Sequence, residues 1–273
     1  MPGVNSDDFF SEKPDESGEP PDAALDHADV QWWRRRRHSS ARRRSFWREL
    51  PILVLVALVL SLTVQTFIAR VYVVPSESME PTLHGCGGCS NDRILVDKVS
   101  YRFTDPRAGD VVVFRGPGNW TSDFTSARSG NAFLSGLQQV GSLIGLAPPD
   151  ERDFVKRVVA TGGQTVQCCD EKGRVLVDGA PLDEPYVVND FPFLPGEQTC
   201  TTPLRSGRCF DPFKVPAGSL WVMGDNRSNS ADSRRHGAVP VTDIIGKARL
   251  VVLPVTRWQV VNAPRINSSA GGP

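Results

Sequence analysis

Residues 50–69 read LPILVLVALVLSLTVQTFIA and contain no charged side chain. A helix rises about 1.5 Å per residue, so a run of this length reaches about 30 Å, which is the thickness of the hydrocarbon core of a bilayer. The sequence therefore predicts one membrane-spanning helix at residues 50–69.

Two other interpretations of this run are a buried core helix and a cleaved secretory signal peptide. A core helix shows polar positions at a period of 3.6, and none occurs before Ser61. A cleaved signal peptide ends in small residues of the A-x-A type, and the following RVYVVPSESM contains no such site. We expect the span to be retained in the mature protein.

The charge of the chain changes sign just before the span. Overall, 31 basic residues balance 31 acidic ones, but the first thirty residues are acidic and rich in Pro, Gly and Ser, a composition typical of disorder. Eight arginines with interleaved aromatic residues then occupy residues 34–48. Such a cluster can bind nucleic acid. Because a span follows it, and cytoplasmic flanks of spans carry the Arg and Lys excess, we predict instead a cytoplasmic tail over residues 1–49.

This orientation predicts that everything after Arg70 lies outside the cytoplasmic membrane, with no nucleic-acid partner. Short β-branched runs bounded by Gly, Pro, Asp or Asn follow there, namely RILVDKV, GDVVVF, DFVKRVVAT, QTVQCC, RVLVDG, SLWVMGD and IIGKARLVVLP. Turn residues at Asp170–Gly173 and in DGAP predict hairpins. The fold class is therefore mainly β: a largely antiparallel domain over residues 71–262, with a flexible tail at 263–273.

Residues 115–151 do not fit this pattern. They are polar and Gly-rich at first and then place apolar residues at mostly helical spacings. We expect an insertion that contains an amphipathic helix packed on the domain.

The segment PSESMEPTL, residues 75–83, places two serines directly beyond the span. A serine hydroxyl attacks a carbonyl only when a base takes its proton. Beyond the span, His84 and His236 are the histidines available, and either would need a partner such as Asp232 to complete a triad. Lys156 is an alternative base, because strand alternation places apolar residues beside it. Burial that lowers the lysine pKa to near 7 costs roughly 4 to 5 kcal/mol. The alternative is a lysine at a strand edge that extends its charged amine to water.

Four segments occur in one order: PSESMEPTL, GDVVVF, FVKRVVATGG and MGDNRSNSADSRRHG. Together they resemble the bacterial type I signal peptidases, membrane-anchored Ser/Lys proteases that remove signal peptides from exported proteins. The resemblance covers most of residues 71–262 and leaves out the acidic tail and the insertion. It implies a serine endopeptidase of the plasma membrane. Its substrates would be preproteins that carry signal peptides, it would work at the lipid bilayer, and it would need no cofactor and no metal.

The resemblance also implies a role for each matching residue. Ser78 would be the nucleophile and Lys156 its general base, while the Ser76 hydroxyl and the Ser78 N–H would form the oxyanion hole. The supporting residues would be Ser230, which orients the lysine, the pair Asp232 and Arg234, which holds the loop, and Gly224, which allows close backbone approach. Candidates for the walls of a pocket for small substrate side chains, or for plain core packing, are Val74, Met79, Leu83, Phe154 and Val155.

Six cysteines depart from this family pattern. Cys86, Cys89, Cys168 and Cys169 suggest either a four-thiolate zinc site or disulfides, and an oxidising location favours disulfides. We predict a Cys200–Cys209 bridge across a short turn, and Cys86 and Cys89 paired with each other or crossing to Cys168 or Cys169.

Other departures are the single span, where some family members carry two, and the long insertion. Two competing functions are a self-cleaving Ser/Lys regulator of the repressor type and an anchored pseudoenzyme. The first needs a DNA-binding module and a cytoplasmic location, which the predicted topology does not provide. The second would be favoured if the purified chain failed to cleave any signal-peptide substrate.

Overall fold

A computed structural model describes residues 46–120 and 153–264. The acidic segment, the arginines before residue 46, nearly all of the expected insertion and residues 265–273 lie outside these ranges. The disordered tail, the amphipathic helix and the C-terminal tail therefore stay predictions.

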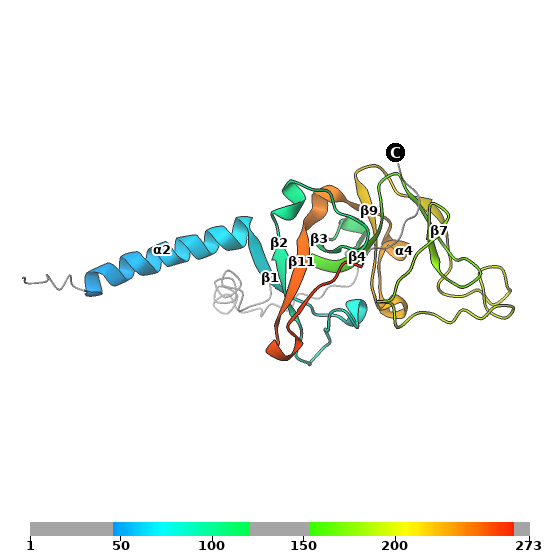
Figure 1. The fold of residues 1–273 in the computed structure, drawn as a ribbon, viewed down its shortest axis with the longest axis horizontal. Helices are drawn as coiled ribbons and strands as arrows, with labels where there is room; N and C mark the ends of the chain where they lie inside the picture. Colours follow the sequence, from blue (N-terminus) through cyan, green and yellow to red (C-terminus); the bar gives the residue numbers. More distant parts are fainter. Residues whose placement is uncertain (1–45, 121–152, 265–273) are drawn as a thin grey trace, which may run out of the picture. The chain divides into compact units, whose positions relative to one another are not determined.

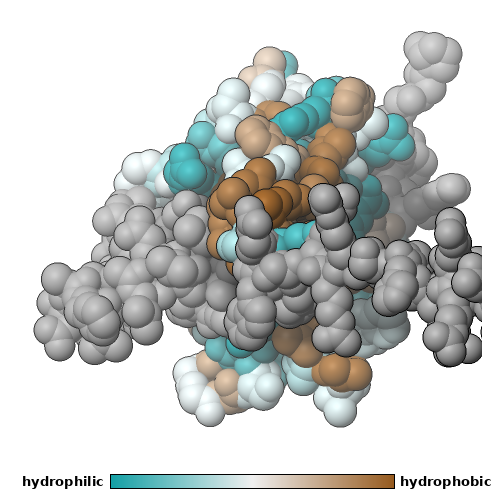
Figure 2. Space-filling model, turned by 90° about the vertical axis from the view of Figure 1, so that its left-hand side faces the viewer, coloured by the Kyte–Doolittle hydropathy of each residue, from teal (hydrophilic) through white to brown (hydrophobic). Residues whose placement is uncertain are grey.

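Helix α2 (Phe46–Phe67) contains most of the uncharged run. Its segment 49–67 has a mean hydropathy of 2.3 with none of it buried, and among the described residues it is the one helix long and apolar enough to cross a bilayer. Figure 2 shows hydrophobic residues (brown) gathered at the centre of one face with hydrophilic residues (teal) around them. The helix ends at Phe67, so the last residues of the predicted span leave it, and Ala69 begins a strand.

The chain divides into two units, residues 1–53 and 54–273, and every strand of the described residues lies in the second unit. An eight-stranded sheet dominates it, in the order β1-β2-β11-β3-β4-β9-β10, with β12 paired to β11 (Figure 1). All of its ladders are antiparallel. Its strands are β1 (Ala69–Val73), β2 (Arg93–Asp97), β3 (Val111–Arg115), β4 (Asp153–Thr161), β9 (Ser219–Met223), β10 (Val239–Pro240), β11 (Ile244–Leu253) and β12 (Gln259–Val260).

A second, four-stranded sheet has the order β7-β6-β5-β8. Its strands are β5 (Thr165–Cys168), β6 (Val175–Val177), β7 (Ala180–Pro181) and β8 (Phe210–Lys214). The two predicted turns close its hairpins: the Gly173 N–H donates to the Asp170 carbonyl at 3.0 Å, and Asp178 and Gly179 take φ of 50° and 80° between β6 and β7. Asp and Gly tolerate this left-handed backbone better than other residues.

Short helical turns connect the strands. They are η1 (Glu77–Met79), η2 (Ser100–Arg102), η3 (Gly118–Trp120), η4 (Arg227–Asn229), α4 (Ser233–His236), η5 (Val241–Asp243) and η6 (Val255–Arg257). Two of them, η1 and η4, bring the segments of the predicted site together.

Buried apolar side chains join the two sheets. Val159 and Trp221 of the large sheet share one hydrophobic cluster with Val166 and Val177 of the small sheet. The β-branched residues that identified the strands in the sequence are thus the ones that fill the interior, because they fit a pleated surface.

The mainly β, largely antiparallel fold class is confirmed. Each of the seven β-branched runs forms a strand. Two longer strands were not predicted from the sequence. They are β1, whose residues ARVYV follow the apolar helix directly, and β8, whose Pro212 makes FDPFK an unusual strand sequence. The two-residue strands were not predicted either, because they carry too few residues for a pattern.

Candidate active site

Ser78 lies in the turn η1, which follows β1 after the exposed Pro75 and Ser76. Its neighbour Met79 is 1% exposed and packs in a cluster with Val74 and Leu83. This apolar packing fixes the turn, so the backbone holds Ser78 at the edge of the core, where the residue is 8% exposed.

Lys156 approaches Ser78 from the middle of β4, where it pairs with Val112 of β3. The residue is 4% exposed, and its Nζ lies 2.6 Å from the Ser78 Oγ. Burial disfavours the ammonium form and lowers the pKa of Lys156 to about 8, against the opposing charges of Asp232 and Asp225. The structure therefore brings together the predicted nucleophile and an amine that is partly neutral near physiological pH.

The Ser76 Oγ lies 3.3 Å from the Ser78 Oγ. Ser76 is exposed, whereas Ser78 is buried. A hydroxyl at this position sits beside the atom that would attack a substrate carbonyl, where a donor to the resulting oxyanion is needed.

Gly224, at the end of β9, is where the second loop meets the serine turn. A Cβ added to Gly224 would lie 2.3 Å from the Ser230 Oγ and 2.4 Å from the Ser78 carbonyl oxygen. No side chain larger than hydrogen fits between these atoms without a shift of the backbone.

Asp232 and Arg234 form an ion pair with Nε 2.8 Å from Oδ1. Asp232 also accepts from the Gly224 N–H at 3.0 Å. Burial alone would raise the pKa of Asp232, but the hydrogen bond and charge of Arg234 outweigh it and hold the pKa below its usual range. The carboxylate is thus ionised and ties Gly224 to the start of α4.

The Ser230 hydroxyl is buried next to Gly224. It makes no hydrogen bond to Lys156 or to any other group within residues 46–120 and 153–264, although it is near enough to Asp232 to help lower that pKa. The structure places Ser230 at the dyad without showing the lysine contact that the resemblance implies.

Two asparagines that are not among the predicted site residues join the two loops. The Asn226 N–H donates to the Ser78 carbonyl at 3.1 Å, and its Nδ2 donates to the Glu77 carbonyl at 3.2 Å. The Asn229 Nδ2 donates to the Glu77 carboxylate at 3.0 Å. Both lie in GDNRSNS, whose Asn-rich composition was the available signal, but only the fold shows what they bind.

A buried cluster behind the dyad centres on Arg157, the residue after the lysine. Its guanidinium is 1% exposed and pairs with Asp225, which is fully buried, at 2.7 Å. Asp225 also accepts from the Thr82 hydroxyl at 2.5 Å, and the Tyr186 ring lies 4.0 Å from the guanidinium carbon. A charged residue inside the apolar run FVKRVVA was the signal that could have identified Arg157.

A second buried pair, Arg227 with Glu184 at 2.5 Å, extends this network. The Arg227 N–H donates to the Asn189 carbonyl at 2.8 Å, and its Nε donates to the Gly224 carbonyl at 2.9 Å. The segment from Glu184 to Asn189 therefore supports the loop that carries Gly224.

Four of the five proposed pocket residues gather near Ser78. Val74, Met79 and Leu83 belong to one buried cluster, and Val155 packs against it. Phe154 packs elsewhere, with its ring 5.8 Å from Phe114 and 5.4 Å from Trp120. The structure thus does not bring Phe154 to this group.

The two candidate histidines have other partners. The His84 Nδ1 lies 2.5 Å from the Glu80 carboxylate, and the His236 ring lies 5.0 Å from Trp120. Asp232, the proposed triad acid, instead pairs with Arg234. No Ser-His-Asp triad forms within the described residues.

The six cysteines form three disulfides: Cys86–Cys89, Cys168–Cys169 and Cys200–Cys209. The predicted Cys200–Cys209 bridge is confirmed, and of the two options for Cys86 and Cys89 the mutual pair forms. The structure does not group the four sulfurs of Cys86, Cys89, Cys168 and Cys169, so that zinc set is not assembled. Two other sets hold ligand atoms within 4.8 Å of one another, His84 with Cys86 and Cys89, and Cys169 with Cys200 and Cys209. Their sulfurs are bonded in disulfides, whereas zinc binds thiolates.

Comparison with known proteins gives a consistent set of relatives. Residues 47–253 match the family described as signal peptidase, peptidase S26. The signal peptidase I of Mycobacterium tuberculosis (strain CDC 1551 / Oshkosh) is 50% identical over 232 residues, which cover 81% of this chain and 77% of the relative. The probable signal peptidase I of Mycobacterium leprae (strain TN) is 47% identical over 84% of this chain and 83% of its own length. The signal peptidase I of Leptolyngbya laminosa is 36% identical over 76% and 80%.

The Arg157–Asp225 pair generates a stability prediction. Asp225→Asn leaves a buried guanidinium without its counter-charge, so we expect the free energy of unfolding to fall by about 3 to 5 kcal/mol in urea denaturation of the detergent-solubilised chain. Asp211→Asn is the control, because its ion pair with Arg205 is exposed at 87% and 52% and should contribute little. Equal effects of the two substitutions would contradict this ranking.

Proposed function

The chain belongs to the signal peptidase family, peptidase S26, so it is a membrane-associated serine peptidase that cleaves signal peptides from preproteins, and we propose that Ser78 and Lys156 carry out the reaction. One observation carries the assignment: the Lys156 Nζ lies 2.6 Å from the Ser78 Oγ, in an environment that lowers the lysine pKa to about 8. The neutral amine can then accept the serine proton.

In the proposed mechanism, the neutral Lys156 amine takes the proton of Ser78 as Oγ attacks the scissile carbonyl. The negative charge that develops on the carbonyl oxygen is stabilised by the Ser76 hydroxyl and the Ser78 N–H, contributions that are worth about 3 to 4 kcal/mol for one donor in other enzymes. The lysine ammonium then protonates the leaving amine, which leaves an ester on Ser78. A water molecule that gives its proton to the same amine hydrolyses this ester and restores the serine.

The supporting residues keep this geometry. We assign Asp232 and Arg234 to holding Gly224, and Ser230 to the surroundings of the lysine amine. Asn226 and Asn229 fix the serine turn. A dyad works only when its atoms are held within a fraction of an ångström, so these contacts act on the rate through position.

We further propose that α2 crosses the plasma membrane with the N-terminus in the cytoplasm and the catalytic domain outside. The arginine cluster before the span supports this orientation, and three disulfides suit an oxidising compartment. A signal peptide places its cleavage site just beyond its own membrane-embedded segment. An anchored domain with its nucleophile a few residues beyond the span meets that site at the membrane surface.

The nucleophile assignment predicts the effect of Ser78→Ala. Cleavage of a preprotein by the detergent-solubilised chain should stop, while the melting temperature stays near that of the wild type, because one hydroxyl is lost. Ser76→Ala should lower kcat by about 10²- to 10³-fold without stopping the reaction, since it removes one oxyanion donor. Near-normal turnover by Ser78→Ala would refute the assignment.

The lysine assignment predicts a pH profile and two inactive variants. Only the neutral amine is active, so the rate should rise with pH through about 8 and then level off. Two pH units below this pKa, the rate should be about a hundredfold lower than on the plateau. Lys156→Ala and Lys156→Arg should both be inactive, because arginine stays protonated. His84→Ala and His236→Ala are the controls and should keep most of the activity. Loss of activity in a histidine variant, with Lys156→Ala still active, would show that the base is wrong.

The proposed orientation predicts the outcome of protease treatment of intact spheroplasts. Protease added outside should digest an epitope placed in residues 115–151 and spare an N-terminal tag. A permeabilised sample is the control, in which both should be digested. Protection of the epitope together with cleavage of the tag would reverse the orientation.

A further inference from the structure

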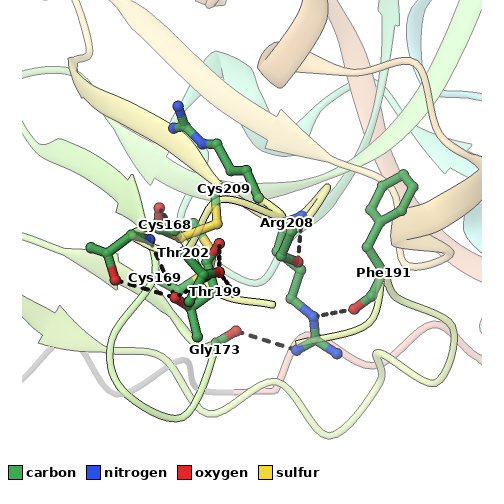
Figure 3. Close-up of a disulfide and its surroundings, with 12 residues drawn as sticks. Cys168, Cys169, Gly173, Phe191, Thr199, Thr202, Arg208 and Cys209 are labelled. Atoms are coloured by element: carbon green, nitrogen blue, oxygen red, sulfur yellow. Dashed lines mark hydrogen bonds between the residues drawn. A yellow bond between two sulfur atoms is a disulfide. The ribbon is translucent and has the colours of Figure 1, made fainter. Parts of the chain in front are cut away.

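Two of the three disulfides lie against each other. The sulfurs of Cys169, Cys200 and Cys209 are all within 4.8 Å of one another, although Cys169 is bonded to Cys168. Figure 3 shows this cluster at the end of β5, with Cys209 beside Cys168 and Cys169. The third disulfide, Cys86–Cys89, is not part of it.

The β5–β8 ladder explains the cluster. Cys168 pairs with Phe210, so continuing the antiparallel register sets Cys169 opposite Cys209. Residues directly opposite in such a ladder have Cβ atoms about 4.5 to 5.5 Å apart. The Cys200 sulfur lies 3.4 Å from the Cys168 carbonyl oxygen. The Cys169 sulfur of one disulfide is thus within 4.8 Å of both sulfurs of the other, and the Cys168 backbone also contacts Cys200.

We propose that Cys168, Cys169, Cys200 and Cys209 form a thiol–disulfide exchange site. An external thiolate, from a small thiol compound or a protein, starts the exchange and is released at its end. Through this exchange the chain converts the pairs 168–169 and 200–209 into 169–209 and 168–200. This goes beyond the peptidase reaction, in which none of the four takes part.

The exchange balances without a net oxidant or reductant. An incoming thiolate attacks the partly exposed Cys200 sulfur, forms a mixed disulfide with it and releases the Cys209 thiolate. Cys209 attacks the adjacent Cys169 sulfur, forms the 169–209 bond and releases the Cys168 thiolate. Cys168 then attacks the Cys200 mixed disulfide, forms the 168–200 bond and expels the original thiolate. Two protein disulfides are present at the start and at the end.

The new pairing changes which segments of the chain the disulfides connect. The starting bonds join residues one and nine positions apart, so each is local. The exchanged bonds join β5 to both ends of the 200–209 loop. The chain between them includes Glu184 and Tyr186, which contact Arg227 and Arg157 behind the dyad. Exchange therefore attaches the segment that carries Glu184 and Tyr186 at both of its ends to the second sheet.

Peptide mapping under non-reducing conditions tests the pairing. The purified full chain in detergent is incubated with a small amount of reduced glutathione without air, acid-quenched, alkylated, digested with trypsin and analysed by mass spectrometry. The starting pairing leaves peptide 158–172 on its own and joins 175–205 to 209–214. The exchanged pairing joins all three into one species, and its appearance after glutathione but not before supports the proposal. Peptide 158–172 remaining unlinked after glutathione would overturn it.

Single substitutions test the attack within the cluster. Cys200→Ser leaves a thiol at Cys209, which should displace Cys168 from Cys169, so that N-ethylmaleimide labels Cys168. Cys209→Ser gives the same test from the other side, with Cys200 bonding to Cys169 and Cys168 again labelled. Cys86→Ser is the matched control, because Cys89 lies outside the cluster and should itself be labelled with the other disulfides unchanged.

Two results would contradict the exchange. One is N-ethylmaleimide on Cys209 in Cys200→Ser, and on Cys200 in Cys209→Ser, with 168–169 intact. The other is one equivalent of zinc retained by the reduced chain after desalting and lost in Cys169→Ser, which would make the four sulfurs a metal site. The exchanged form should also melt a few degrees higher, because its disulfides close longer loops.

Discussion

The structure depends on keeping the Lys156 amine out of water next to Ser78. Lowering the lysine pKa from 10.5 to about 8 costs about 3 kcal/mol, which the rest of the fold must supply. Two buried carboxylates, Asp232 and Asp225, raise the lysine pKa and oppose this effect. Each is paired with its own arginine, Arg234 and Arg157, at 2.8 and 2.7 Å. Each arginine partly neutralises the charge of its aspartate. The two carboxylates can therefore lie close to Lys156 without keeping the lysine fully protonated.

The same constraint explains why the site needs two loops from distant parts of the sequence. Lys156 contacts the serine turn through Ser78, and two carboxylates of the loop after β9, Asp225 and Asp232, act on its charge. The serine turn and this loop meet at Gly224, where the Ser78 carbonyl and the Ser230 hydroxyl leave no room for a Cβ. Asn226 then bonds the carbonyls of Glu77 and Ser78 to the second loop. Ser78 is therefore held in place through its backbone carbonyl, which accepts from Asn226.

Patterns local in the sequence predicted much of this arrangement. The uncharged run identified α2, β-branched runs identified the longer strands, and four segments in order pointed to Ser78 and Lys156. What was missed depends on contacts between distant residues. Arg157 was visible as a charge in an apolar run, but its partners Asp225, Thr82 and Tyr186 come from three other segments. The cysteines show the same limit, because spacing suggested the 200–209 bridge while only the β5–β8 register places Cys169 beside it.

The short connection between anchor and nucleophile has a further consequence in the proposed topology. An extended chain spans at most about 3.3 to 3.6 Å per residue, so the link from Ala69 to Ser78 reaches no more than about 30 Å from the end of the span. The first half of that link is β1, which is paired along its whole length with β2. Lys98, just after β2, donates to the carbonyl of Thr66 at 3.1 Å near the end of α2. The start of the link is therefore a strand of the sheet, and Val74 continues it by donating to the Asp92 carbonyl at 2.9 Å. Because the site cannot move far from the anchor, a substrate must bring its scissile bond to the membrane surface, and a signal peptide does so through its own apolar segment.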